Sequence, residues 1–242
     1  MIKYLVFIFI ALSPAYAKTI SVSVFESGDS QFFETAKRGL EFFSLQVKRS
    51  CSIDIDFEIN RGSIASTHDI NFVNETMTVE YEGLQLKYFQ PSLVELLKSN
   101  NLLNYKRELT LIDVPNLTGH CGFAFPKVQF EQSLPMDFKE QLKDHVLLNL
   151  KGGGCGSSSR LIAHELAHIF IQDNPPHMCE DGPCDENNIL SVYRYISNFD
   201  ENQSRGRRHN RYEDPIFRQR VPSVGVDIDT HQCLSILKTL GF

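Results

Sequence analysis

Residues 161–177 read LIAHELAHIFIQDNPPH and combine a helical pattern with a cluster of polar side chains. The apolar residues recur at helical spacing, which predicts an amphipathic helix that begins near Arg160. Glycines at 152–154 interrupt the preceding apolar run, and serines at 157–159 are of a type preferred at helix N-caps. Pro175 and Pro176 end the helix, because proline lacks the amide hydrogen and clashes with the preceding turn.

Three polar residues of this helix have the spacing of a metal site. His164 and His168 are four positions apart, so a helix places them one turn apart on the same face. At this spacing two imidazole nitrogens can each approach one Zn2+ ion to about 2.0–2.1 Å. Glu165 points away from them by about a third of a turn, where a general base for the attacking water is needed. The pattern predicts zinc ligands at His164 and His168 and a catalytic Glu165.

A third ligand is needed, because catalytic zinc usually has three protein ligands and one open position. His177 follows the two prolines, and a histidine just past such a turn can fold back under the helix. We predict that His177 is this ligand. Glu186 is the alternative, since some zinc peptidases take a glutamate from a second helix, although residues 185–188 have the composition of a turn. A surface histidine in a proline-rich loop is the remaining interpretation of His177.

The chain before this helix alternates between strand and helix patterns. Period-two alternation predicts strands at residues 19–25 and 53–59, and helical spacing predicts a helix at about residues 30–49 between them. Further strands are expected at 77–81, 109–114 and 145–150, a helix after Pro91, and a terminal helix up to Leu240. This order predicts an α/β fold with a mixed twisted sheet and a single domain over residues 18–242.

The first residues have the features of an export signal. Lys3 precedes an apolar run at residues 4–12, and Ala15 and Ala17 give the small-x-small pattern of a cleavage site. The run is shorter than the roughly 20 residues that span a bilayer. We expect a signal peptide at residues 1–17 and a protein that is secreted, periplasmic or in the cell envelope, with no membrane span after cleavage.

The composition of the remaining chain is consistent with export. It contains six cysteines, and an even count in an exported protein favours three disulfides, whose pairing the sequence leaves open. The formal net charge of the full chain is −6, and removal of Lys3 makes it about −7, which argues against a nucleic-acid binder. The oligomeric state is open as well.

The sequence resembles the metzincin zinc peptidases in three segments. His164 to His168 looks like the start of their extended zinc motif. Residues 187–191, NNILS, are similar to the Asn-x-Met-Ser segment that forms their Met-turn beneath the metal. Residues 119–126, GHCGFAFP, look like the edge strand that lies above their cleft and pairs with substrate. The resemblance implies an α+β fold of the zincin type, with an active-site helix and a C-terminal helix.

The chain also departs from the metzincin pattern. That family has glycine three residues after the second histidine and a ligand six residues after it, where this chain has Ile171 and Asn174. Leu190 stands where the methionine of the turn would be. The turn after the helix is therefore later, and the third ligand moves to His177.

The resemblance implies a secreted zinc endopeptidase that acts on a protein or peptide substrate. Tyr193 or Tyr195 could donate to the oxyanion, but packing in the core is the favoured role for both, so neither is counted among the predicted site residues. Two alternatives stay open. One is a secreted binding or structural protein on an inactive zincin scaffold, and the other is a gluzincin-like peptidase that uses Glu186.

Overall fold

The computed structural model describes part of the chain, and several predicted features lie outside that part. The described residues are 16–28, 31–64, 76–81, 84–89, 97, 99–102, 109–114, 121–125, 143–150, 159–171, 187–191, 193–196, 219–222 and 225–242. The alternative third ligands His177 and Glu186, and most of the predicted signal peptide, are therefore not described. The same holds for most of the helix predicted after Pro91.

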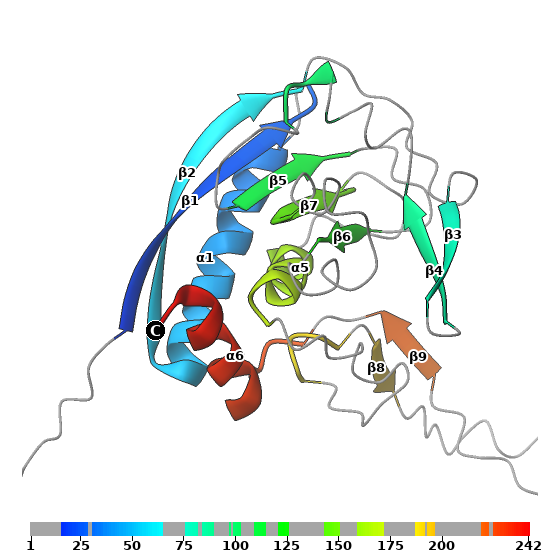
Figure 1. Cartoon of the computed structure of the whole chain (residues 1–242). Coiled ribbons are helices and arrows are strands. Elements are labelled where there is room, and N and C mark those ends of the chain that lie inside the picture. Colours follow the sequence, from blue (N-terminus) through cyan, green and yellow to red (C-terminus); the bar gives the residue numbers. More distant parts are fainter. Residues whose placement is uncertain are drawn as a thin grey trace, which may run out of the picture.

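A five-stranded sheet forms the centre of the molecule (Figure 1). Its strands, in spatial order, are β2 (Ile53–Ser63), β1 (Tyr16–Glu26), β5 (Leu109–Asp113), β7 (His145–Leu148) and β6 (Gly122–Ala124). The first four are parallel, and β6 runs antiparallel to β7 at the end of the sheet. The predicted mixed α/β fold is confirmed.

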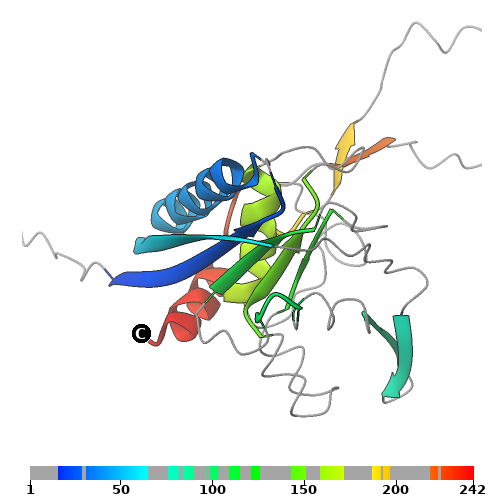
Figure 2. The same ribbon diagram turned by 90° about the horizontal axis from the view of Figure 1, so that it is seen from above.

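The helices pack against this sheet and against each other. They are α1 (Phe32–Cys51), α5 (Ser159–Phe170) and α6 (Thr230–Leu240). Figure 1 shows α1 and α5 within the curve of the sheet, with α6 near their lower ends, and Figure 2 shows α1 running along β1 and β2. The helix α1 ends at Ser52, which adopts a left-handed conformation.

The two central helices approach closely because one of them has a glycine at the contact. A Cβ atom at Gly39 of α1 would lie 2.5 Å from Cβ of Ile162 in α5, closer than packed carbons approach. Below this contact the rings of Phe43 and Phe170 stack with their centroids 5.3 Å apart. Leu40 and Ile162 are completely buried. The apolar face of α5 therefore packs against α1 and is shielded from solvent. The position of α5 therefore follows from core packing.

The terminal helix α6 is attached to both central helices. A disulfide joins Cys51, the last residue of α1, to Cys233 in α6. The hydroxyl of Thr239 donates to the carbonyl of Phe170, the last residue of α5, at 2.8 Å. Cys121 is disulfide-bonded too, to a cysteine outside the described residues. Disulfide bonding was predicted, and this structure supplies the Cys51–Cys233 pairing that the sequence left open.

Two small antiparallel sheets lie apart from the main one. The strand predicted at 77–81 is β3 (Thr76–Tyr81), which pairs with β4 (Leu84–Phe89), and β8 (Tyr193–Ile196) pairs with β9 (Gln219–Pro222). The strands β4, β8 and β9 were not predicted. Within the part of the chain that the structure describes, no helix is long and apolar enough to cross a membrane.

Candidate metal centre

Two histidines of α5 present ring nitrogens to each other. The Nε2 atoms of His164 and His168 are 3.2 Å apart, and the two rings stand nearly perpendicular, at 89°. A tetrahedral zinc ion with bonds of about 2.0–2.1 Å holds two ligand nitrogens roughly 3.3 Å apart. The same distance allows an N–H···N hydrogen bond when no metal is bound. The separation of the two nitrogens is therefore compatible with a shared zinc ion.

The other ring nitrogen of His164 is held by the turn that the sequence analysis compared with a Met-turn. His164 Nδ1 lies 2.8 Å from the backbone carbonyl oxygen of Ile189. A carbonyl oxygen only accepts, so Nδ1 carries the hydrogen and Nε2 keeps its lone pair. Metal-binding histidines commonly make such a bond with their second nitrogen, which fixes the tautomer and the ring orientation.

The turn itself is held by a buried pair of amide side chains. Asn188 Nδ2 donates to Gln232 Oε1 at 3.0 Å, and Gln232 Nε2 donates back to Asn188 Oδ1 at 2.9 Å. Asn188 Oδ1 also accepts from the backbone amide of Leu190 at 3.0 Å. Gln232 belongs to the N-terminal capping box of α6, together with Asp229. The carbonyl that orients His164 is thus tied to the first turn of α6.

A close backbone contact adds to this support. The amide of Ile189 donates to the carbonyl of Asp227 at 2.7 Å. A Cβ atom at Gly225 would lie 2.1 Å from the carbonyl oxygen of Asn188, so only glycine fits there. The turn and the segment that precedes α6 are therefore in direct backbone contact.

Glu165 lies in the interior between α5 and β6. It is only 6% exposed. Burial raises the pKa of its carboxyl group to about 8, although the backbone amide of Ala124 favours the charged form and lowers the pKa. A Cβ atom at Gly122 would lie 2.5 Å from Glu165 Oε1, so the glycine makes room for the carboxylate.

The strand β6 has one edge paired with β7 and one edge unpaired within the described sheet. The amide of Phe125 donates to the carbonyl of His145 at 2.9 Å, and the carbonyl of Cys121 accepts from the amide of Asn149 at 2.8 Å. In an antiparallel pair the intervening residues turn their amide and carbonyl groups away from the partner. Ala124 is one of these residues, and its amide interacts with Glu165.

Three of the predicted site residues belong to the part of the chain that the structure describes. His164, His168 and Glu165 lie in α5, next to the turn at 187–191 and to β6. His177 and Glu186 lie outside the described residues, and the description of β8 does not extend to the side chains of Tyr193 and Tyr195. Among the described residues, no group of three or more His, Cys, Asp or Glu side chains is arranged to hold a metal ion.

Sequence reasoning missed several residues that support the centre. Gln232 has no local signal, because its partner Asn188 is 44 positions away in the chain. Gly122 and Gly225 are recognisable only once their neighbours in space are known. A glycine in a short strand is a general sign of close approach by another group, and this sign is present at Gly122.

Comparisons with known proteins do not show the family of this chain. No model of a known protein family matches the chain, and no curated protein does. A solved structure described as "Structure of a chaperone-substrate complex" is similar to this chain, with 12% identity and a TM-score of 0.37. The similarity covers 64% of this chain and 23% of that chain, so this chain spans a small part of that protein's length. A similarity at this level supports no functional inference.

Proposed function

We propose that this protein is a secreted zinc-dependent endopeptidase of metzincin-like type. The observation that carries the proposal is the paired Nε2 atoms of His164 and His168, 3.2 Å apart, with the tautomer of His164 set by the Ile189 carbonyl. His164 is buried and His168 is half-buried. Here Glu165 lies on the same helix and is almost fully buried.

In this proposal His164, His168 and His177 hold the zinc ion. Zinc, when bound, supplies Lewis acidity: it polarises the scissile carbonyl and makes water a better nucleophile near neutral pH. A cation near Glu165 favours the charged form of its carboxyl group and lowers the pKa from the value of about 8 that burial gives it. This shift favours the ionised carboxylate that a general base requires.

Glu165 has two tasks in the reaction. It takes a proton from the attacking water and later gives it to the leaving amine. Gly122 leaves space for the carboxylate beside β6, and the Ala124 amide orients it. This position keeps the proton carrier next to the strand on which the substrate lies.

The proposed substrate is an extended peptide that pairs with β6. Peptides add to exposed sheet edges through main-chain hydrogen bonds, and β6 is the last strand of the described sheet. Ala124 has its amide and carbonyl on the side away from β7. Its amide already donates to Glu165, so the Ala124 carbonyl is the group that this proposal assigns to pairing with the substrate.

The metzincin-like assignment has further support in the order of the elements. The segment compared with the metzincin edge strand is antiparallel to its neighbour and next to α5, and the segment compared with the Met-turn contacts His164. Both contacts support the proposed resemblance. We propose export through a signal peptide at residues 1–17 on the sequence pattern and, secondarily, on the disulfide between Cys51 and Cys233.

The test is hydrolysis of a mixed quenched-peptide library by the oxidised protein, beside Glu165→Ala and a Glu34→Ala control. Glu34 is an exposed glutamate of α1, so the control removes the same side chain far from β6. We expect cleavage by the parent and the control that a chelator abolishes, and at least a 100-fold loss in Glu165→Ala, a typical effect of removing a general base. Zinc content is measured for all three proteins.

Other results would point to the alternatives. Equal cleavage by Glu165→Ala would contradict the role of this residue. Retention of zinc without cleavage by the parent would favour a binding or structural protein. The third ligand is tested separately: His177→Ala loses zinc and Glu186→Ala keeps it, whereas the reverse result would indicate the gluzincin-like arrangement.

A further inference from the structure

Two buried carboxylates lie side by side where two parallel strands end. Glu26 is the last residue of β1, and Asp113 is the last residue of β5. Phe25 is paired with Ile112 in the register of these strands, so the next residues along each chain are neighbours as well. Glu26 is 6% exposed and Asp113 is 2% exposed. Neither residue belongs to the candidate zinc centre.

Each carboxylate uses one oxygen for hydrogen bonds within the protein and leaves the other without a partner. Asp113 Oδ2 accepts from the amide and the hydroxyl of Ser27, at 3.3 and 2.7 Å. Glu26 Oε1 accepts from Arg61 Nε at 2.6 Å and forms an ion pair with a second nitrogen of the same guanidinium. Glu26 Oε2 and Asp113 Oδ1 are buried and have no partner among the described residues.

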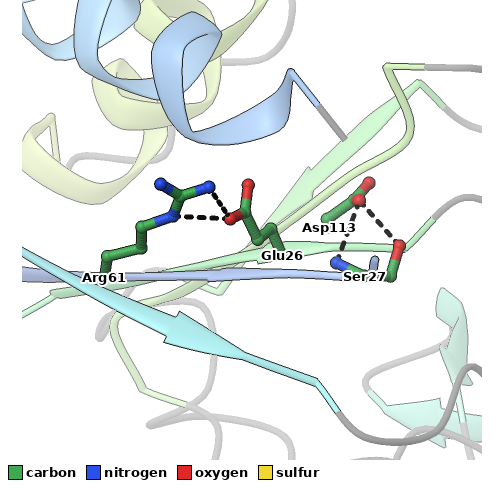
Figure 3. Close-up of polar contacts among 4 residues, drawn as sticks. All are labelled: Glu26, Ser27, Arg61 and Asp113. Carbon is green, nitrogen blue, oxygen red and sulfur yellow. Dashed lines mark hydrogen bonds and ion pairs between the residues drawn. The ribbon is translucent and has the colours of Figure 1, made fainter. Parts of the chain in front are cut away.

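The two unpartnered oxygens lie on the same side of the sheet. Figure 3 shows both carboxylates rising from neighbouring strands, and in each the upper oxygen carries no contact and points in the same direction. Buried polar atoms nearly always have a partner, and a buried charge without one is strongly destabilising. The Arg61 guanidinium offsets only one of the two negative charges. The arrangement therefore calls for a further positive group.

The topology of the sheet places this pair at a position where ligands commonly bind. From β1 the chain crosses to β2 on one side, and it later enters β5 on the other side of β1. The gap between β1 and β5 is thus a topological switch point. In open sheets of parallel strands, ligands bind outside the carboxyl ends of the strands at such a point. Glu26 and Asp113 flank this gap at that end.

We propose that Glu26 Oε2 and Asp113 Oδ1 bind one divalent cation of the hard class, Mg2+ or Ca2+. Carboxylate oxygens are the ligands that these ions prefer, and Mg2+ in particular is often bound by one or two carboxylates with water in its other positions. Ser27 and Arg61 hold the two inner oxygens, so the outer ones are already oriented. This site is separate from the zinc ligands and does not depend on the proposed peptidase activity.

The test is thermal unfolding of the oxidised full chain, freed of Mg2+ and Ca2+ and then titrated with MgCl2 or CaCl2. We expect a saturable rise in Tm with at least one of the two ions, of about 5–10 °C at 100 times the dissociation constant. Isothermal titration calorimetry measures the affinity directly. Asp113→Asn and Glu26→Gln are expected to weaken that affinity at least tenfold, in line with roughly 10–100-fold for lost metal-site groups.

A matched control separates the site from general charge effects. Asp56 is an exposed aspartate of β2, so Asp56→Asn removes one negative charge elsewhere and is expected to leave the response intact. If Asp113→Asn does not fold, Glu26→Gln decides, because it leaves the Ser27–Asp113 hydrogen bonds in place. The proposal is overturned if neither ion produces a saturable response in the parent. It is also overturned if both variants respond as the parent does, as they would if a proton or water occupied the gap.

Discussion

Replacing Glu165 by glutamine is expected to stabilise the metal-free protein at pH 8 and to change it little near pH 4.5. Burial raises the pKa of Glu165 from 4.5 to about 8. Between these two values the folded protein holds a proton that the unfolded chain has released. The free energy of unfolding of the parent therefore falls as pH rises through this window. Glutamine does not ionise, so the variant escapes this loss.

The size of the effect follows from the two pKa values. The burial contribution of Glu165 changes by roughly 3–4 kcal/mol between pH 5 and pH 8, at 1.36 kcal/mol per unit of pKa and with allowance for partial ionisation at each end. The side chain is almost fully buried, so solvent screening does not reduce the figure. Glutamine keeps an oxygen that can accept from the Ala124 amide. The stability gap between variant and parent is therefore expected to widen by this amount from pH 5 to pH 8.

The assay is urea unfolding of chelator-treated parent, Glu165→Gln and Glu41→Gln at both pH values, with the disulfides oxidised. Glu41 is exposed on α1, and its replacement controls for the loss of one negative charge at the surface. Surface substitutions of this kind usually change stability by less than about 0.5 kcal/mol. A gap between Glu165→Gln and parent that is the same at pH 5 and pH 8 would refute the argument that burial raises this pKa.

Three further substitutions test the support of the centre and of the fold. Gly122→Ala places a methyl group against the Glu165 carboxylate. It is expected to lower peptidase activity and to destabilise the fold by about 1–3 kcal/mol, the usual effect of overpacking. Activity equal to that of the parent would show that the carboxylate does not need this space. Gln232→Ala removes the hydrogen bonds between the Gln232 and Asn188 side chains that hold the turn at 187–191. It is expected to weaken zinc binding by about 10–100-fold in a chelator competition. Unchanged zinc affinity would contradict the link between α6 and His164. The double change Cys51→Ser and Cys233→Ser removes a disulfide between residues 182 positions apart. It is expected to lower the free energy of unfolding, measured with urea, by up to about 5 kcal/mol, because a disulfide that closes a long loop restricts the unfolded chain most. A loss below about 1 kcal/mol would show that the unfolded chain is already restricted without this disulfide, for example by residual structure.

The parts of the fold that were predicted are those with a local pattern. The strand at Ile20 to Val24 and the helix around Leu40 and Phe43 bury one face, and burial of one face leaves a period of two or 3.6 residues in the sequence. The hairpin of β3 and β4 has only two residues between its strands, yet Glu82–Gly83 is not among the strongest turn signals. Its second strand was therefore missed.

The candidate site divides in the same way. His164, Glu165 and His168 are close in sequence, so helical geometry alone predicts their arrangement. The partners that orient them come from other elements: the Ile189 carbonyl, the Gln232 amide and the space at Gly122. Nothing near these residues in the sequence indicates which distant group they meet. Their roles follow from the topology, which a single sequence does not reveal.

The hydrogen bond from Thr239 to Phe170 has a consequence for how this helix can vary in evolution. Many helices stop at a glycine that satisfies their last carbonyls by a local turn. Here a hydroxyl from a residue 69 positions later serves the last carbonyl of α5, and the next residue, Ile171, is buried. A contact at the end of α5 is thus encoded near the other end of the chain. A change that shifts the register of the C-terminal helix would therefore also change the contact at the end of α5. The residues at the end of α5 and the sequence of the C-terminal helix should then change together among relatives.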